Sequence, residues 1–99
     1  MDIMITSKNN EMFFTDKFVI TIGTNKSYNF ELDLNYDTSL SIQYDFFTKS
    51  YFILNTFSNS NVLFCNKPLN KLELGQFNRL HFKNSDEFLI IRVLKRISA

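Results

Sequence analysis

The sequence offers few side chains that could catalyse a reaction or hold a metal. It contains one histidine, His81, and one cysteine, Cys65. That is too few for the sets of His and Cys ligands that hold zinc in proteins. Alternation within Leu80-His81-Phe82 places the histidine on the solvent side of a predicted strand, and Cys65 is expected to be a small buried side chain. The sequence therefore predicts no metal, no cofactor and no enzyme active site.

Phosphate-binding and glycosylation signals are equally weak. Two glycines cannot supply a glycine-rich loop that cradles a phosphate. The carboxylates of Glu31, Asp33 and Asp45 are spread along predicted strands without forming a convergent pair. Asn25-Lys26-Ser27 matches the glycosylation sequon, but no secretion signal precedes it, so the match is attributed to chance.

Composition limits the possible partners and compartment. Eleven basic and ten acidic residues give a net charge of +1, and the basic residues are dispersed, so neither nucleic acid nor direct membrane insertion is expected. A lone cysteine and the absence of a signal peptide favour a reducing, cytoplasmic location. The 99 residues are expected to form one domain, residues 1–99, that belongs to a larger protein.

Apolar and polar residues alternate along most of the chain, which is the period of half-buried β-strands. The clearest example is the stretch 17–25, in which Phe18, Ile20 and Ile22 alternate. It ends at Gly23, where a sharp turn or a positive φ is expected. Residues 69–80 could compete as a helix, although Gly75 weakens that alternative. The other expected strands cover residues 1–6, 11–15, 28–34, 40–47, 51–54, 62–65, 72–74, 80–82 and 88–94, with a tight turn at 66–69.

About nine to eleven short strands, mostly antiparallel, indicate an all-β sandwich or barrel. In their order and spacing the strands resemble the forkhead-associated (FHA) family, β-sandwich domains whose loops at one end bind phosphothreonine peptides. The resemblance runs from Phe18 to Val93. It is carried by five segments in the family's order: Thr21-Ile22-Gly23, Asn29-Phe30-Glu31-Leu32, residues 60–67 with Ser60, Asn61 and Asn66 as matches, residues 72–82 with Asn78 where Asp is usual, and Phe88-Leu89-Ile90.

The sequence departs from the family at the positions that bind phosphate. In the family the glycine is followed by an arginine, whereas Gly23 is followed by Thr24. The family's next loop reads Ser-Arg-x-His, whereas this chain has Thr38-Ser39-Leu40-Ser41. The resemblance therefore implies an FHA-like sandwich without the two arginines that usually hold phosphothreonine.

Two functional interpretations follow from the resemblance, with a purely structural β-sandwich as a third. The first is a non-catalytic docking module for a protein or peptide, with weak or no dependence on phosphothreonine, that helps to assemble a larger complex. The second is a working phosphothreonine reader. A sheet face with exposed aromatics, such as Phe47 and Tyr51, is an alternative surface. The expected binding residues lie in the loops: Thr24, Asn25, Lys26, Thr38, Ser39, Ser41, Ser60 and Asn61.

Overall fold

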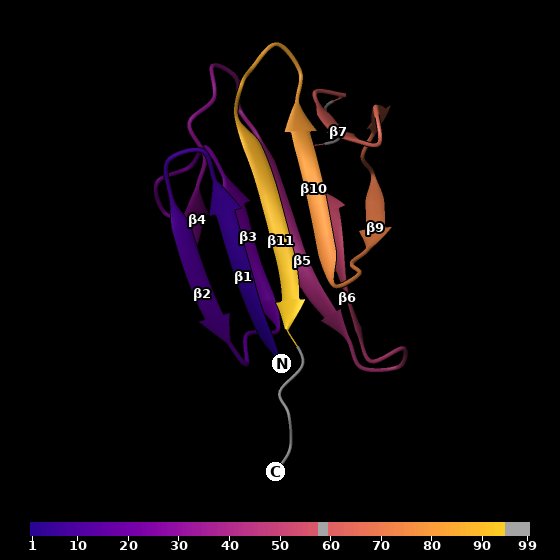
Figure 1. Ribbon diagram of the computed structural model, residues 1–99. Helices are drawn as coiled ribbons and strands as arrows, with labels where there is room; N and C mark the ends of the chain where they lie inside the picture. The colour runs from indigo at the N-terminus through magenta and orange to yellow at the C-terminus, as the bar shows by residue number, and fades with distance from the viewer. Residues whose placement is uncertain (58–59, 95–99) are drawn as a thin grey trace.

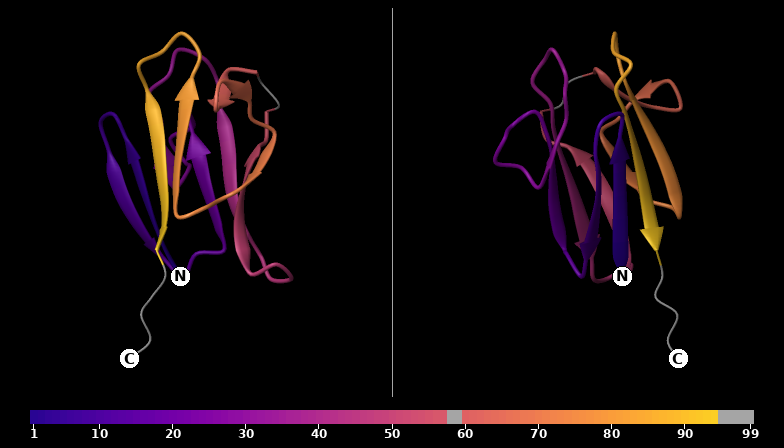
Figure 2. Two further views of the ribbon diagram at one scale, coloured as in Figure 1. Left: turned by 45° about the vertical axis from the view of Figure 1, so that its right-hand side comes forward. Right: turned by 60° about the vertical axis from the view of Figure 1, so that its left-hand side comes forward.

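The computed structural model describes residues 1–57 and 60–94, and all regular structure within them is β-strand. Sheet A has the order β2-β1-β11-β10-β7-β8 and sheet B the order β4-β3-β5-β6-β9. The two sheets lie face to face (Figures 1 and 2). Every described pairing is antiparallel except that of β3 with β4. The expected all-β sandwich is thus confirmed, with strands β1 (Asp2–Ser7), β2 (Glu11–Thr15), β3 (Val19–Gly23), β4 (Phe30–Glu31), β5 (Ser39–Asp45), β6 (Ser50–Asn55), β7 (Val62–Phe64), β8 (Lys67–Pro68), β9 (Lys71–Glu73), β10 (Phe77–Phe82) and β11 (Phe88–Leu94).

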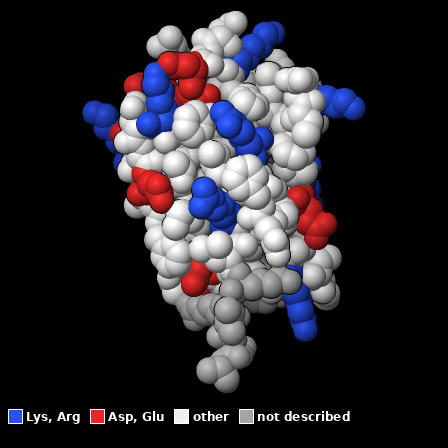
Figure 3. All heavy atoms as spheres, in the orientation of Figure 1, with Lys and Arg blue, Asp and Glu red and all other residues white. Residues whose placement is uncertain are grey.

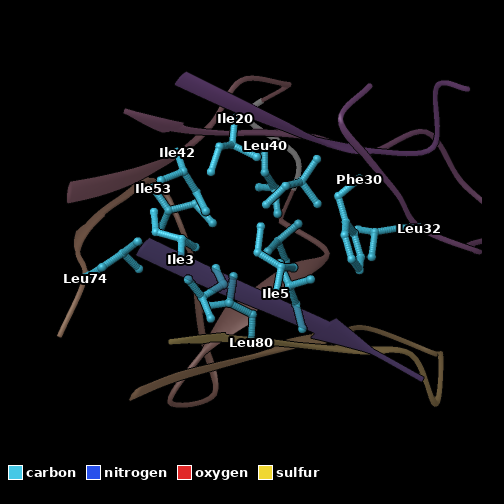
Figure 4. Packing of buried hydrophobic residues seen from close by; sticks show 14 of the residues in the cluster. Ile3, Ile5, Ile20, Phe30, Leu32, Leu40, Ile42, Ile53, Leu74 and Leu80 are labelled. Atoms are coloured by element: carbon cyan, nitrogen blue, oxygen red, sulfur yellow. The ribbon is translucent and has the colours of Figure 1, made fainter. Parts of the chain in front are cut away.

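One apolar core fills the space between the sheets. The strands that alternate most regularly in sequence, β1, β6 and β10, bury every second residue. In sheet B, Ile42 pairs with Ile20 on one side and Ile53 on the other, so three branched side chains form a row across the sheet. Ile3 and Ile5 of β1 face that row from sheet A (Figure 4).

Gly23 ends β3 where the backbone of the β4–β5 connection passes very close. A Cβ built on Gly23 would lie 2.0 Å from the carbonyl oxygen of Thr38 and 2.9 Å from a ring carbon of Tyr28. Its φ is not positive, so the residue is required by this close approach and not by a left-handed backbone. Of the two reasons expected for this glycine, a sharp turn or a positive φ, the second is wrong.

Several predicted strand limits are wrong. The sequence predicts one strand over residues 28–34, but β4 contains only Phe30 and Glu31. The backbone then leaves the sheet with Leu32, whose N–H donates to the carbonyl of Gly23 at 2.7 Å. The apolar residues 30, 32 and 34 thus turn toward the core from a segment that is mostly irregular and not from one continuous strand. Residues 69–80 contain β9 and the start of β10, which excludes the alternative helix.

The burial of several aromatic residues at the end of the sandwich opposite Gly23 differs from prediction. Phe46 is 65% exposed because the chain turns after Asp45, and Phe18 is 52% exposed, although alternation places both inside. Tyr51 is only 3% exposed, so its expected place on an exposed face is wrong; its hydroxyl donates to the carbonyl of Lys17 at 2.9 Å. Phe47, at 98% exposed, is as expected.

The turn between β7 and β8 lies earlier in the chain than the sequence predicts. Cys65 and Asn66 form a two-residue loop with φ of 51° and 63°, as a type I′ hairpin turn requires. Lys67 and Pro68, expected in the turn, form β8 instead. The Cys65 side chain is exposed, so the expectation that it is buried is wrong.

The two glycines provide a matched test of the Gly23 contact. Gly23→Ala should destabilise the domain by about 3 kcal/mol or more, because the new methyl group meets backbone that cannot move independently. Gly75→Ala should stay within about 1 kcal/mol of wild type, since the nearest atom to an added Cβ there is 3.8 Å away. Urea denaturation of both variants measures the difference, and equal midpoints would contradict this account of Gly23.

Candidate functional site: the apical loops

Three loops meet at the end of the sandwich where β3 and β6 finish and β5 begins. We call them the apical loops and define them as residues 24–29, 32–38 and 56–61, of which residues 58 and 59 lie outside the described part. They lie at the upper end of the molecule in Figure 1. They contain six of the eight expected binding residues; Ser39 and Ser41 lie just beyond them, in β5.

Thr24 and Thr38 are joined to each other through backbone and side chain. The N–H of Thr24 donates to the Thr38 carbonyl at 3.0 Å, and the Thr24 hydroxyl accepts from the Thr38 N–H at 3.1 Å. The Thr38 side chain is 1% exposed, and within the described residues its hydroxyl has no hydrogen-bond partner. Thr24 therefore fixes the position of Thr38, and the Thr38 hydroxyl does not face solvent.

Ser39 belongs to a partly buried hydroxyl network. Its Oγ accepts from the Tyr28 hydroxyl at 3.0 Å and from the Thr56 hydroxyl at 2.6 Å. The Thr56 hydroxyl is also 2.9 Å from the Ser39 carbonyl oxygen. Through this network Ser39 links all three apical loops, and its side chain is only 8% exposed. Sequence reasoning missed Tyr28 and Thr56, because nothing in their local pattern signals a contact with Ser39.

Ser41, Asn25 and Lys26 occupy different surroundings. Ser41 is 7% exposed on β5 and accepts from the Gln43 amide at 3.2 Å. Asn25 is exposed, and its side-chain oxygen accepts from the Ser27 N–H at 2.9 Å, which shapes the 24–29 loop as an Asx turn. Lys26 is exposed at the same tip. Only the two loop-tip residues of these three are open to a partner.

The charges around the two hollows at this end are acidic. The described residues that line a hollow of about 220 Å³ are Thr24, Asn25, Tyr28, Asp37, Thr38 and Phe57. Among them Asp37 has the one carboxylate and none is basic. Lys26 instead lines a second, open hollow of about 560 Å³ together with Glu31 and Asp33. Sequence reasoning missed Asp37, which adjoins a predicted site residue but carries no motif.

Ser60 and Asn61 belong to the third loop. Ser60 is exposed and Asn61 is half-buried. The Asn61 carbonyl accepts from the Lys83 N–H at 2.8 Å, which ties the third loop to the end of β10. Neither residue lines the hollow beside Thr38, so the structure does not bring them together with Thr24 and Thr38 around that hollow.

A buried carboxylate holds the neighbouring loops in place. Glu87 is 4% exposed, and one oxygen accepts from the N–H groups of Lys8 at 2.9 Å and Phe88 at 3.1 Å. The other oxygen lies 3.4 Å from the N–H of Asp33. The β1–β2 loop and the 32–38 loop are thereby fixed to the start of β11. No local signal identifies this role, because the three donors are far apart in sequence.

Two further contacts support this end of the molecule. The Tyr36 hydroxyl donates to the Lys83 carbonyl at 2.9 Å, and burial raises the pKa of Tyr36. The hydrogen bond between the Lys8 ammonium and the Asp86 carboxylate lowers the pKa of Asp86 and raises that of Lys8. Across residues 1–57 and 60–94, no three His, Cys, Asp or Glu side chains are grouped to hold a metal, and no helix is long and apolar enough to cross a membrane.

The fold is shared with a solved FHA domain. The crystal structure of Mycobacterium tuberculosis Rv1747 FHA-1 is similar to this chain, with a TM-score of 0.80 and 13% sequence identity over 95% of this chain and 97% of that one. Comparison of the sequence with family models finds no match, and comparison with curated proteins finds none either. The chain has the FHA fold, which confirms the resemblance at the level of structure.

Removal of the Glu87 carboxylate should destabilise the domain. Glu87→Ala leaves three backbone donors without their acceptor, and each unsatisfied buried group costs about 1–3 kcal/mol. We expect a loss of about 2–4 kcal/mol in chemical denaturation. Glu11→Ala, at an exposed carboxylate, is the control and should change little. Equal midpoints for the two variants would contradict the tethering role.

Removal of the Thr38 hydroxyl and removal of the Ser39 hydroxyl should have opposite effects on the stability of the domain. Thr38→Val removes a buried hydroxyl without a described partner and keeps the side-chain shape, so stability should be unchanged or rise by up to about 1 kcal/mol. Ser39→Ala removes an acceptor that two hydroxyls use and should cost about 1 kcal/mol. Thermal unfolding compares them. A larger loss for Thr38→Val would mean that its hydroxyl is engaged.

Proposed function

We propose, from the FHA fold and the chemistry of the apical loops, that this chain is a non-catalytic protein-interaction module that does not require phosphothreonine. FHA domains bind protein or peptide partners through loops at one end of the sandwich. In this proposal the apical loops bind an unphosphorylated segment, and binding serves the assembly of a larger protein or complex. The module needs no cofactor.

The observation that carries the proposal is the charge of the hollow beside Thr38. This hollow lies between the positions at which the family presents its phosphate-binding arginines. Here it is lined by the Asp37 carboxylate and by no basic side chain. A dianionic phosphate would be repelled by Asp37 and would find no cationic donor at Thr24 or Ser39.

The expected loss of affinity is large. Each hydrogen bond to a charged group contributes about 1.5–3 kcal/mol, so two lost arginine contacts weaken phosphate binding by about two to four decades. Lys26 does not replace them, because it lines a different hollow with Glu31 and Asp33. An ammonium also lacks the planar fork that holds phosphate in a bidentate manner.

The groups that remain accessible suit an unphosphorylated peptide. Asn25, Lys26 and Ser60 are exposed, and Thr24 and Asn61 are half-buried at the same end. Hydroxyl and amide side chains can hydrogen-bond to the backbone of an extended segment. Ser39 and Ser41 act within the domain, since their hydroxyls already accept from internal donors.

Titration with phosphothreonine peptides tests the proposal. A phosphothreonine peptide library and its unphosphorylated twin should bind the domain equally or not at all, as measured by fluorescence anisotropy. Binding of the phosphorylated library that is tighter by about tenfold or more, a difference of about 1.4 kcal/mol, would overturn the proposal in favour of a phosphothreonine reader.

A charge-restoring variant separates lost charge from altered loop shape. Thr24→Arg combined with Asp37→Ser adds a guanidinium and removes the acid at the hollow. We expect the double variant to gain preference for the phosphorylated library. Asp45→Ser with wild-type Thr24 is the control, because Asp45 starts the hairpin at the opposite end of β5. No gain in the double variant would show that loop shape, and not charge alone, prevents phosphate binding.

A further inference from the structure

We propose that the outer face of β10 and β11 is a second docking surface, which binds an acidic segment of a partner protein. The inference rests on the proposed function only in that the domain is a protein-interaction module. The surface lies on sheet A, on the side away from the core. It does not include the apical loops.

Two arginines stand on this face, each stacked on a phenylalanine ring. Arg92 of β11 lies directly opposite Phe77 of β10, with its guanidinium carbon 5.9 Å from the ring centroid. Arg79 of β10 lies over Phe88 of β11 at 5.2 Å. Both distances are within cation–π range, and such a contact leaves N–H donors of the guanidinium able to meet a ligand.

The use of arginine in this chain is concentrated here. Eleven residues are basic, and eight of them are lysines. The three arginines are Arg79, Arg92 and Arg96, the last of which lies outside the described residues. Lysine suffices where a solvated charge is needed, whereas a planar bidentate donor requires arginine. Both described arginines therefore lie on the proposed surface, where they can bind a carboxylate of a partner.

Neither arginine forms an ion pair with a described residue. The ion pairs among the described residues are Met1 with Asp16 and Lys8 with Asp86. Strands β10 and β11 contain two arginines and a histidine but no Asp or Glu. These two strands thus present two positive groups without a carboxylate between them, which is complementary to an acidic ligand.

Apolar side chains continue the surface across the sheet. Strand register aligns Phe77, Arg92, Met4 and Phe13 in one row over four strands. Phe77 is 60% and Phe13 53% exposed. Figure 3, which views this side of the molecule, shows basic side chains in its middle with uncharged ones around them. A partner segment should therefore combine Asp or Glu with aromatic or aliphatic residues.

A protein partner is favoured over nucleic acid. Asp2 and Glu11 occupy outward positions in β1 and β2, beside the same row. A polyphosphate backbone would meet these acids, and the two arginines offer few of the contacts that give nucleic-acid binding its affinity. A mixed acidic and apolar segment can place its carboxylates over Arg79 and Arg92 alone.

Selection from a random peptide display library on the intact chain tests the inference. We expect the selected peptides to be enriched in Asp or Glu together with aromatic or aliphatic residues. Arg79→Gln with Arg92→Gln should weaken their binding by at least about tenfold, and the paired lysine variant should restore it only in part. Binding should also fall as salt concentration rises. Amide chemical-shift changes should map to β10 and β11.

A matched pair of exposed phenylalanines supplies the control. Phe77→Ser should reduce binding, whereas Phe47→Ser, at an exposed ring on the β5–β6 hairpin, should not. Thermal unfolding of every variant confirms that it is folded. Selected peptides without acidic residues, binding that survives both glutamine substitutions, or tighter binding of a single-stranded oligonucleotide would each overturn the inference.

Two other outcomes would overturn the inference without overturning the proposed function. Self-association that the glutamine substitutions abolish would assign this face to a second copy of the chain. Peptides whose shift changes fall on the apical loops would remove the second surface while leaving phosphate-independent binding intact. A phosphorylated peptide is acidic and would also meet Arg79 and Arg92. The phosphothreonine titration is therefore repeated on the paired glutamine variant, in which its result reports on the apical loops alone.

Discussion

The apical end depends on the close approach of two backbones, at Gly23 and Thr38. No side chain fits between them, since a Cβ on Gly23 would lie 2.0 Å from the Thr38 carbonyl oxygen. The same carbonyl accepts from the Thr24 N–H, and the Gly23 carbonyl accepts from the Leu32 N–H. The end of β3 is therefore bonded to both ends of the 32–38 loop. The geometry of the site thus follows from the absence of one methyl group.

Short neutral side chains occupy the apical end of this fold. The residue after Gly23 uses its hydroxyl to accept from the Thr38 backbone, and Ser39 uses its own to join Tyr28 and Thr56. These short neutral side chains thus form hydrogen bonds within the domain. Hydroxyl networks of this kind rigidify a loop without giving it charge. Hydrogen bonds within the domain therefore fix the apical loops, and the side chains around the hollow beside Thr38 are neutral or acidic.

The sequence determined the strands well because alternation reports which side of a strand faces the core. Ile20, Ile22, Leu40 and Ile42 are all buried as alternation requires. Alternation says nothing about where the sandwich ends, so it placed Phe46 inside. Tyr51 is in phase with Ile53 on β6 and both are buried, so the expected exposure of Tyr51 disagrees with alternation itself. Alternation also extended β4 over an irregular segment.

The site residues were predictable only as far as the family motif reaches. The motif predicts Thr24 and Thr38 as site residues, because it places them directly after Gly23 and directly before Ser39. Asp37, by contrast, acts through its position on the wall of a hollow, and Glu87 acts on donors from three separate segments. Such contacts depend on how loops that are distant in sequence pack together. Neither alternation nor a motif marks these positions, so the contacts cannot be predicted from a single sequence.

The short strands at the sheet margins have a consequence for association. An open sheet margin exposes unpaired N–H and C=O groups that can template a strand from another chain. Three of the four margins here, β4, β8 and β9, are two or three residues long, and β8 contains Pro68, which has no N–H. The remaining margin, β2, has five residues. Among the described margin strands, β2 is therefore the longest edge open to strand addition, and the other three expose little backbone of their own.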